Sequence, residues 1–321
     1  MKKRVLAIVC MLAMVLSLAA CGSAPAADDG VYTVGICQLV THDALDAATQ
    51  GFKDALIAEL GEDKVVFLEE NAAGDSVLCG TIATDFVAKN VDLIMANATA
   101  SLQAAAAATA DIPILGTSVT EYGVALDIAD FNGTVGGNIS GTSDLAPLDK
   151  QADMVKEWFP DAKTVGLLYC SAEPNSQYQV DTVKGYLEKM GYTCTLYAFT
   201  DTNDAAAVTQ NAADNSDVIY VPTDNTVASN CELIDNICRP AGVPIIAGEE
   251  GICSGCGVAT LSISYYDLGV ATGKMAAKIL TGEANISEMP IEYAATQTPK
   301  YNADICADLN LKVPDGYAEI Q

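Results

Sequence analysis

From Val31 onward, short apolar runs alternate with longer segments of helical spacing. Apolar runs of strand length occupy residues 31–38, 64–70, 92–98 and 112–119. Between them, the segments 42–60, 75–90 and 101–110 repeat apolar residues at helical spacing, and the first ends at Gly61. Alternation of this kind predicts βαβ units, in which each helix returns the chain to the same edge of a parallel sheet.

The alternation breaks once and then restarts. Residues 131–149 are rich in Gly and have no period, which predicts a crossing point between two halves of the molecule. Further strands are predicted at 164–170, 193–199, 217–222, 243–249 and 258–264, and further helices at 177–190, 203–215, 227–239 and 266–280. The pattern therefore predicts an α/β fold of two doubly wound parallel-sheet lobes, with the tail from Asn285 passing back between them.

The N-terminus predicts export from the cytoplasm. The basic start MKKR precedes an apolar run that is shorter than the roughly 20 residues of a membrane-spanning helix, and this is the pattern of a secretory signal peptide. The sequence LAAC at 18–21 resembles the lipobox of bacterial lipoproteins, which implies cleavage before Cys21 and a diacylglycerol on its sulfur. An ordinary signal peptide with an incidental Cys is the alternative. The small polar residues 22–30 predict a flexible tether, so we expect an extracytoplasmic protein anchored to the cell membrane.

Charge narrows the choice of partners. The formal net charge of the chain is −26, and loss of Lys2, Lys3 and Arg4 with the signal peptide would make it −29. Such a surface repels nucleic acid phosphates, so no nucleic acid partner is expected, and nothing in the pattern requires more than a monomer. The chain has 11 Cys and 1 His. For the nine Cys that remain after Cys10 and Cys21, free thiols are favoured over disulfides and over a metal site, because CSGC at 253–256 has no second CxxC.

Polar residues gather where the predicted strands end. In open α/β sheets a ligand binds beyond the carboxyl ends of the strands. The residues there carry hydroxyl, amide and carboxylate groups with almost no Lys or Arg, which suits a small zwitterion such as a free amino acid. Asp224 is the first candidate for its ammonium group and Glu173 the second. Thr99, Thr142, Ser143 and Ser176 are candidates for its carboxylate, and Ser118 belongs to the first of two GTS triplets, at 116–118 and 141–143. Capping of a helix is the alternative role for each.

Enzymatic functions are disfavoured. The sequence contains no GxSxG, P-loop or GxGxxG motif, and His42 has no evident Ser or Cys partner. Glu249 and Glu250 are adjacent acids, but adjacency alone gives no catalytic geometry. We therefore expect a protein that is not an enzyme and that needs no cofactor.

Several motifs, in order, resemble one family. They are VGICQLVTHDALDAATQGFKDAL, NISGTSD, GLLYCSAEPNSQYQ, VIYVPTDNTVAS and SYYDLGVATGKMAAKIL. Together they resemble substrate-binding lipoproteins of ABC transporters, of the tryptophan/tyrosine-binding type. The resemblance implies a type I periplasmic binding protein fold, in which two lobes close on a ligand by a hinge, and delivery of an aromatic amino acid to a membrane permease. By motif it points to Gln38, His42, Thr142, Ser143, Asn175, Ser176, Asp224 and Asn225. Cys170 and the TSVTEYG stretch depart from the family pattern.

The resulting organisation has four parts. They are a signal peptide (1–20), the lipidated Cys21 with its tether (21–30), a first lobe (31–143 with about 264–290) and a second lobe (144–263 with about 291–321). Three functions stay open: an importer's binding protein, a module that presents its ligand to a membrane sensor, and a binding protein for another small solute. A transcription regulator is disfavoured, since the chain has an export signal and no basic helix-turn-helix segment.

Overall fold

The computed structural model describes residues 30–320. The chain divides into a short unit, Met1–Val31, and a long unit, Tyr32–Gln321, which contains every helix and strand described below. The predicted signal peptide and the predicted lipidation site at Cys21 lie outside the described residues. Within residues 30–320, no helix combines the length and the apolar character that crossing a membrane requires.

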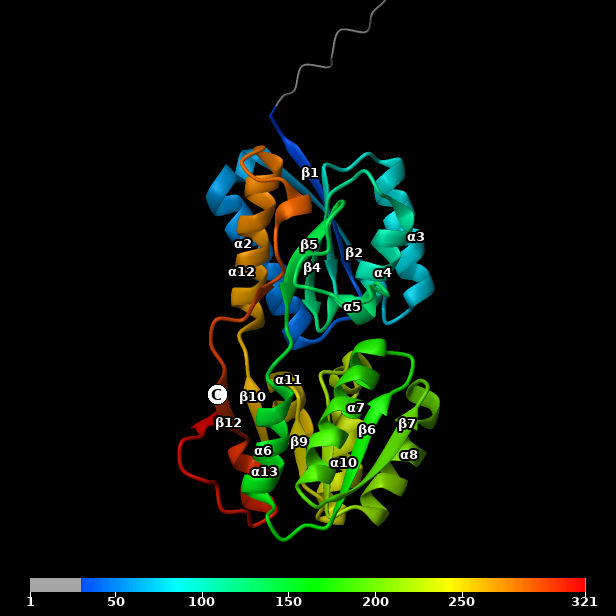
Figure 1. Ribbon diagram of the computed structural model, residues 1–321, viewed down its shortest axis with the longest axis vertical. Helices are drawn as coiled ribbons and strands as arrows, with labels where there is room; N and C mark the ends of the chain where they lie inside the picture. Colours follow the sequence, from blue (N-terminus) through cyan, green and yellow to red (C-terminus); the bar gives the residue numbers. More distant parts are fainter. Residues whose placement is uncertain (1–29, 321) are drawn as a thin grey trace, which may run out of the picture. The chain divides into compact units, whose positions relative to one another are not determined.

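The first lobe is built on a parallel sheet with the strand order β11-β5-β4-β3-β1-β2. Its strands are β1 (Tyr32–Gln38), β2 (Val65–Asn71), β3 (Leu93–Asn97), β4 (Ile114–Val119), β5 (Ile139–Ser143) and β11 (Glu292–Tyr293). Its helices are α2 (Asp43–Leu60), η1 (Glu62–Lys64), α3 (Ser76–Ala88), α4 (Thr99–Ala108), α5 (Tyr122–Ala125), α12 (Tyr265–Leu280) and η2 (Ile286–Glu288). Helices α2 and α12 lie on one face of the sheet, and α3 and α4 lie on the other (Figure 1).

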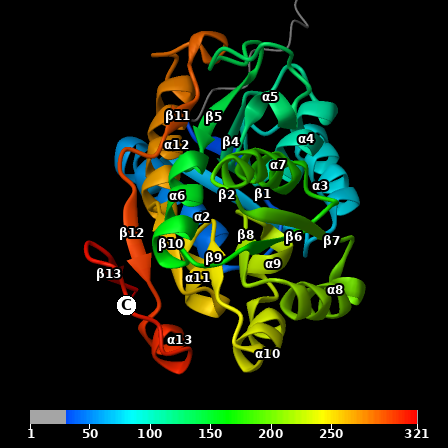
Figure 2. The ribbon, with the colours of Figure 1, turned by 60° about the horizontal axis from the view of Figure 1, so that its bottom comes forward.

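The second lobe has the strand order β13-β12-β10-β9-β8-β6-β7, parallel except where β12 pairs with β10. Its strands are β6 (Thr164–Cys170), β7 (Thr193–Phe199), β8 (Val218–Val221), β9 (Ile245–Ala247), β10 (Ala259–Ser262), β12 (Thr298–Tyr301) and β13 (Ala318–Glu319). Its helices are α6 (Leu148–Trp158), α7 (Pro174–Lys189), α8 (Thr202–Asn215), α9 (Asn225–Ala228), α10 (Cys231–Ala241), α11 (Glu250–Cys256) and α13 (Ala303–Asp308). Helices α6 and α7 cover one face, and α8, α10 and α11 cover the other (Figure 2).

Each lobe thus buries apolar strand residues on both faces of its sheet. In β1, for example, Val34 and Ile36 pack toward α2 and α12, whereas Cys37 packs toward α3 and α4. Two predominantly parallel sheets, each covered by helices on both faces, confirm the fold class predicted from the sequence.

The chain crosses between the two sheets three times (Figure 1). It leaves the first sheet after β5, returns through β10 into α12, and leaves again between β11 and β12. The last crossing therefore falls between Tyr293 and Thr298, slightly beyond the approximate boundary at 290. The crossing segments bring the ends of the two sheets together.

The segment 131–149 differs from its prediction. It contains β5, which lies between β4 and β11 in the first sheet, and the start of α6, whereas the sequence predicted irregular structure throughout. Strand β5 reads ISGTS and is buried at every position. It escapes detection because its buried side chains are mostly small and polar, so the strand has no apolar alternation.

Candidate ligand-binding site

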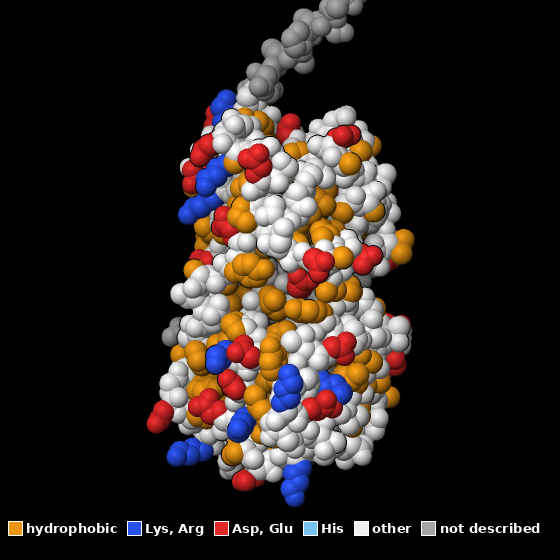
Figure 3. All heavy atoms as spheres, in the orientation of Figure 1, with side chains coloured by type: hydrophobic (Ala, Val, Ile, Leu, Met, Phe, Trp, Pro, Cys, Tyr) orange, Lys and Arg blue, Asp and Glu red, His pale blue; other side chains and the backbone are white. Residues whose placement is uncertain are grey.

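The carboxyl ends of the strands in the two lobes face one another. His42, which follows β1, contacts Asn225, which follows β8, with 3.2 Å between Nε2 and Oδ1. A cavity of about 290 Å³ beside this contact is lined by Thr41 and His42 from the first lobe and by Ser229 and Cys231 from the second, among others. Figure 3 shows hydrophobic side chains gathered in the band between the lobes on the face that it presents. Of the site residues predicted from the sequence, His42 lines this cavity and contacts Asn225 across the two lobes.

The side chain of Asp224 forms its hydrogen bonds within the second lobe. Its side chain accepts hydrogen bonds from the backbone N–H groups of Cys170 (2.7 Å) and Val227 (2.9 Å), and the second of these caps α9. Burial, together with the nearby charge of Glu173, raises the pKa of the Asp224 carboxyl. Both carboxylate oxygens thus have backbone partners, which is the capping alternative stated above.

Glu173, Asn175 and Ser176 form the turn that precedes and opens α7. Glu173 accepts from the N–H and Nδ2 of Asn225 and from the N–H and Oγ1 of Thr226, at 2.7–3.1 Å. Asn175 donates from Nδ2 to Glu173 and to the carbonyl of Thr223. Ser176 is fully buried. These side chains fix the loop between β8 and α9 and hold Asn225 toward the first lobe.

Three of the expected first-lobe residues also serve the framework. Gln38 donates from Nε2 to Asp46 Oδ1 (2.6 Å) and to the carbonyl of Val40 (2.9 Å), which holds the β1–α2 loop. The hydroxyl of Thr142 lies between those of two other Thr residues. Ser143 donates to the carbonyl of Thr120 at 2.7 Å. These side chains position the loop and the crossing segment.

Ser118 and Thr99 lie at an irregularity in β4 and at the start of α4. The β4–β5 register shifts between Gly116 and Val119, and Ser118 adopts a positive φ of 53°. A non-Gly residue in this conformation is uncommon and is found preferentially at functional sites. The Ser118 hydroxyl is buried and has no hydrogen-bond partner within the described residues. Thr99 is the first residue of α4, whose N-cap, Ala98, has φ 92° and provides no side-chain cap. Ala98 donates its N–H to the carbonyl of Thr117, so the start of α4 lies beside the bulge.

Asp144 is the residue that the sequence reasoning missed. It directly follows the second GTS triplet, is 3% exposed, and accepts a hydrogen bond on Oδ2 from the hydroxyl of Tyr265 (2.9 Å). Its other oxygen, Oδ1, has no partner within the described residues. Burial raises the pKa of Asp144 to about 6, while the hydroxyls of Tyr265 and Thr120 act in the opposite direction. Its backbone N–H donates to the carbonyl of Val119, which places it beside the bulge.

A second buried acid lies near Asp144. Glu249 follows β9, is 3% exposed, and caps α11 by accepting from the N–H groups of Gly251 and Ile252. Burial raises the pKa of Glu249 to about 7, and the charges of Asp144 and Glu250 add to this effect. Lys300 is paired with the neighbouring Glu250 at 2.8 Å. The region therefore favours a positively charged group between the lobes.

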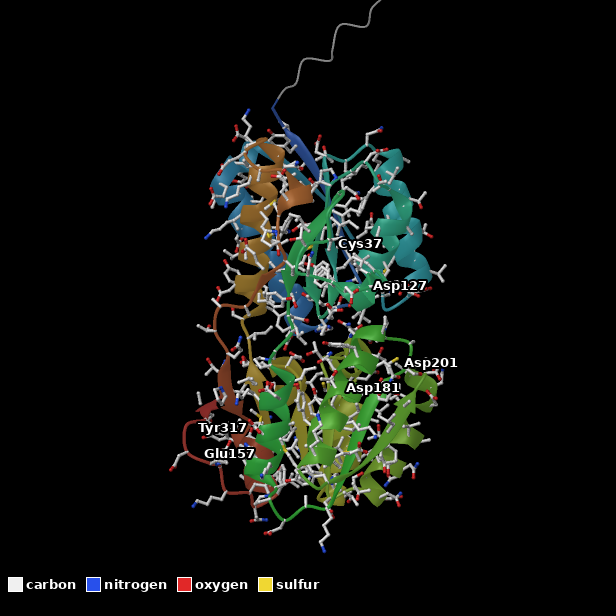
Figure 4. All side chains as sticks on the ribbon, viewed as in Figure 1. Cys37, Asp127, Glu157, Asp181, Asp201 and Tyr317 are labelled. Carbon is white, nitrogen blue, oxygen red and sulfur yellow. The ribbon has the colours of Figure 1, made fainter. Side chains whose placement is uncertain are left out.

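The cysteines do not form a metal or disulfide site within the described residues. All nine cysteines there are free thiols. Cys37 lies in the interior of the first lobe, where it and Cys79 each approach the hydroxyl of Ser101 at 3.6 Å (Figure 4). Residues 30–320 contain no group of three His, Cys, Asp or Glu side chains that could hold a metal ion. The cysteines mostly behave as small core residues.

Comparisons with known proteins agree with this architecture. The family model described as ABC transporter substrate binding protein matches residues 33–317. A tyrosine-binding protein of Clostridioides difficile is 36% identical over 262 residues, which are 80% of this chain and 75% of that protein. A crystal structure of an ABC domain from Streptococcus pneumonia in complex with L-Trp is 32% identical, has a TM-score of 0.85, and covers 90% of this chain and 100% of its own.

A further structure shows a different arrangement. The ligand-free, open structure of a substrate-binding protein with adhesive properties from Clostridium difficile is 37% identical and covers 91% of this chain and 99% of its own. Its TM-score is only 0.69, although its sequence is more similar than that of the Trp complex. The present structure is thus more similar to the L-Trp complex than to the ligand-free, open structure.

Proposed function

This chain belongs to the ABC transporter substrate-binding protein family, has the type I periplasmic binding protein fold and acts outside the cytoplasm as a binding protein and not an enzyme; from this premise we propose that it binds an aromatic amino acid between its lobes. The tyrosine-binding relative and the L-Trp complex support an aromatic ligand. The resemblance noted in the sequence is thereby confirmed at the level of the family.

The observation that carries the proposal is the free oxygen of Asp144. A buried carboxylate with one unpartnered oxygen is costly by itself and is stabilised by an ammonium group. The bulge beside it presents the Ser118 hydroxyl and lies next to the uncapped start of α4, where backbone N–H groups and Thr99 suit a carboxylate. The ammonium and carboxylate groups of one amino acid are close together, as are these two regions of the first lobe.

The second lobe completes the proposed site. Asn175, Ser176, Asp224 and Asn225 form its wall, with Asp224 and Glu173 holding that wall in place and Asp144 taking the ammonium role first considered for Asp224. Tyr178 on α7 lies near Glu121 and Tyr293 of the first lobe, and burial, together with the charge of Glu121, raises the pKa of Tyr178. Aromatic side chains at the edge of the interlobe region suit a flat ligand side chain.

The substitution Asp144→Asn tests the site. It keeps the shape of the side chain and its contact with Tyr265 but removes the charge, so we expect the affinity for L-tyrosine or L-tryptophan to fall by roughly 30-fold or more. Isothermal titration calorimetry at pH 7.5 measures this change. Asp149→Asn, at an exposed position at the start of α6, is the matched control and should bind as the wild type does. Equal affinities for the two variants would remove Asp144 from the site, and no binding by the wild type would refute the ligand class.

We also propose that the protein is a lipoprotein that delivers its ligand to a permease for import. The lipobox-like sequence at 18–21 and the short polar segment that follows it support an anchored binding protein. Replacement of Cys21 by Ser should move the protein from the membrane fraction to the soluble fraction of cells. Retention of the Cys21→Ser protein in washed membranes would contradict the lipid anchor.

A further inference from the structure

A single hydrogen-bonded chain connects the lobes through His42. The amide of Asn225 donates from Nδ2 to Glu173 Oε2 at 2.7 Å, and this bond orients the amide so that Oδ1 faces His42. Because Oδ1 is an acceptor only, His42 must donate from Nε2, at 3.2 Å. The orientation of the Asn225 amide therefore fixes the tautomer of the imidazole when it is neutral.

Both ends of this chain are held in place within their own lobes. Glu173 accepts four hydrogen bonds from Asn225 and Thr226, so displacement of Asn225 would break its two bonds to Glu173. His42 is the N-cap residue of α2, has extended backbone and makes no side-chain cap, which leaves its imidazole directed at the other lobe. Gln38 holds the loop before His42 through Val40 and Asp46. The hydrogen bond between His42 and Asn225 thus joins an element held within the first lobe to one held within the second.

We propose that His42 and Asn225 form a latch that holds the lobes closed and thereby slows release of the ligand, an inference that rests on the proposed function. His42 acts here as a positioning residue: it sets the closed arrangement through Asn225 and Glu173 and does not itself bind the ligand. This assignment replaces the ligand contact expected for His42 from the sequence.

The charges around the imidazole are consistent with a neutral donor. Burial lowers the pKa of His42, although Asn225 and the carboxylates of Glu173, Asp46 and Asp43 act in the opposite direction. The Cys231 thiol lines the same cavity from α10. A neutral side chain with one N–H at this position can therefore replace the imidazole, and Gln is such a side chain.

The test compares His42→Ala with His42→Gln. Stopped-flow measurement of L-tyrosine or L-tryptophan release should show dissociation about 2- to 10-fold faster for His42→Ala, the effect of losing one hydrogen bond, with little change in association. His42→Gln should restore most of the slow release. Gln50→Ala is the matched control, since Gln50 is exposed on α2 and donates to Asp54 of the same helix at 2.7 Å, and it should release ligand at the wild-type rate.

Two results would overturn the latch. One is equal dissociation rates for His42→Ala and Gln50→Ala, and the other is failure of His42→Gln to restore slow release. If the wild type binds neither amino acid, the proposed function fails, and small-angle X-ray scattering then tests the latch directly. A larger radius of gyration for His42→Ala than for His42→Gln would support it, and equal radii would refute it.

Discussion

At the scale of single residues, the charge on Asp144 that is proposed to bind the ligand is expected to destabilise the ligand-free fold. It is buried beside the crossing segment, one of its oxygens has no partner in the described residues, and its pKa is raised to about 6. In the proposed function, the ammonium group of the ligand and not the fold compensates the charge of this carboxylate. By contrast, Asp224 is equally buried but has backbone partners on both oxygens.

This difference predicts that Asp144→Asn stabilises the ligand-free protein at neutral pH. The folded pKa of about 6 lies above the usual aspartate pKa of 3.8, so the fold favours the neutral carboxyl. The stabilisation of the fold by the neutral carboxyl is fully present below the unfolded pKa and is lost as the pH rises through about 6. At pH 7 the ionised Asp144 therefore lowers the free energy of unfolding by about 3 kcal/mol relative to a neutral side chain. Urea denaturation should show Asp144→Asn more stable than the wild type by about 1–3 kcal/mol at pH 7.

The same measurement at pH 4 serves as the internal control. There the carboxyl is already neutral in the folded protein, so the two proteins should unfold at nearly the same urea concentration. Asp149→Asn should match the wild type at both pH values. An Asp144→Asn protein that is less stable than the wild type at pH 7 would show that the ionised carboxylate stabilises the ligand-free fold.

The residues of the site could be located from the sequence more readily than their roles could be assigned. Ser118 lies near the end of β4, and Asn175 and Asp224 follow β6 and β8, so the strand-end rule alone selects them as site candidates. It does not reveal that Asp224 caps α9 or that the bulge at Ser118 leaves a hydroxyl unpartnered. Those roles depend on hydrogen bonds to residues far away in the sequence, as does the contact of Asp144 with Tyr265, 121 residues later.

At the scale of elements, strands with continuous apolar runs could be predicted from the sequence. A strand such as β5, whose buried side chains are polar and hydrogen-bonded to other elements, could not. In β5, Thr142 bonds to the hydroxyls of Thr117 (3.1 Å) and Thr272 (2.9 Å), and Ser140 donates to the carbonyl of Met289 (3.0 Å). These partners come from β4, α12 and the segment before β11, so nothing local to 139–143 signals a buried strand.

The pairing of α2 with α12 shows a further limit of local patterns. The two helices pack closely along one face of the first sheet. A Cβ on Gly269 would lie only 2.0 Å from the carbonyl oxygen of Ala48, so this position requires Gly. Gly in a helix interior lowers helix propensity, yet here it allows the backbone of α12, which directly follows a crossing segment, to contact α2. The helix was predicted, but its partner could not be.

At the scale of the whole molecule, the arrangement of the lobes depends on the charge between them. Asp144 is attached to the first lobe through Val119 and Tyr265, whereas Glu249 caps a helix of the second lobe. The charge of Asp144 contributes to raising the pKa of Glu249 to about 7. Closure therefore brings two buried acids together, which is unfavourable when both are ionised and no cation lies between them.

We therefore expect the free protein at pH 8 to be more open than the present structure. Small-angle X-ray scattering of the ligand-free wild type should give a radius of gyration above the value calculated from this structure. Saturating L-tyrosine or L-tryptophan should lower the radius of gyration to that value, because the ligand's ammonium group compensates both carboxylates. Asp144→Asn should show little response to the amino acid, and Asp149→Asn should respond as the wild type does. At pH 5, where both acids are largely neutral, the difference between free and bound protein should shrink. A radius of gyration that stays the same with and without a bound amino acid at pH 8 would show that closure does not depend on the ligand, and the charge argument would then fail.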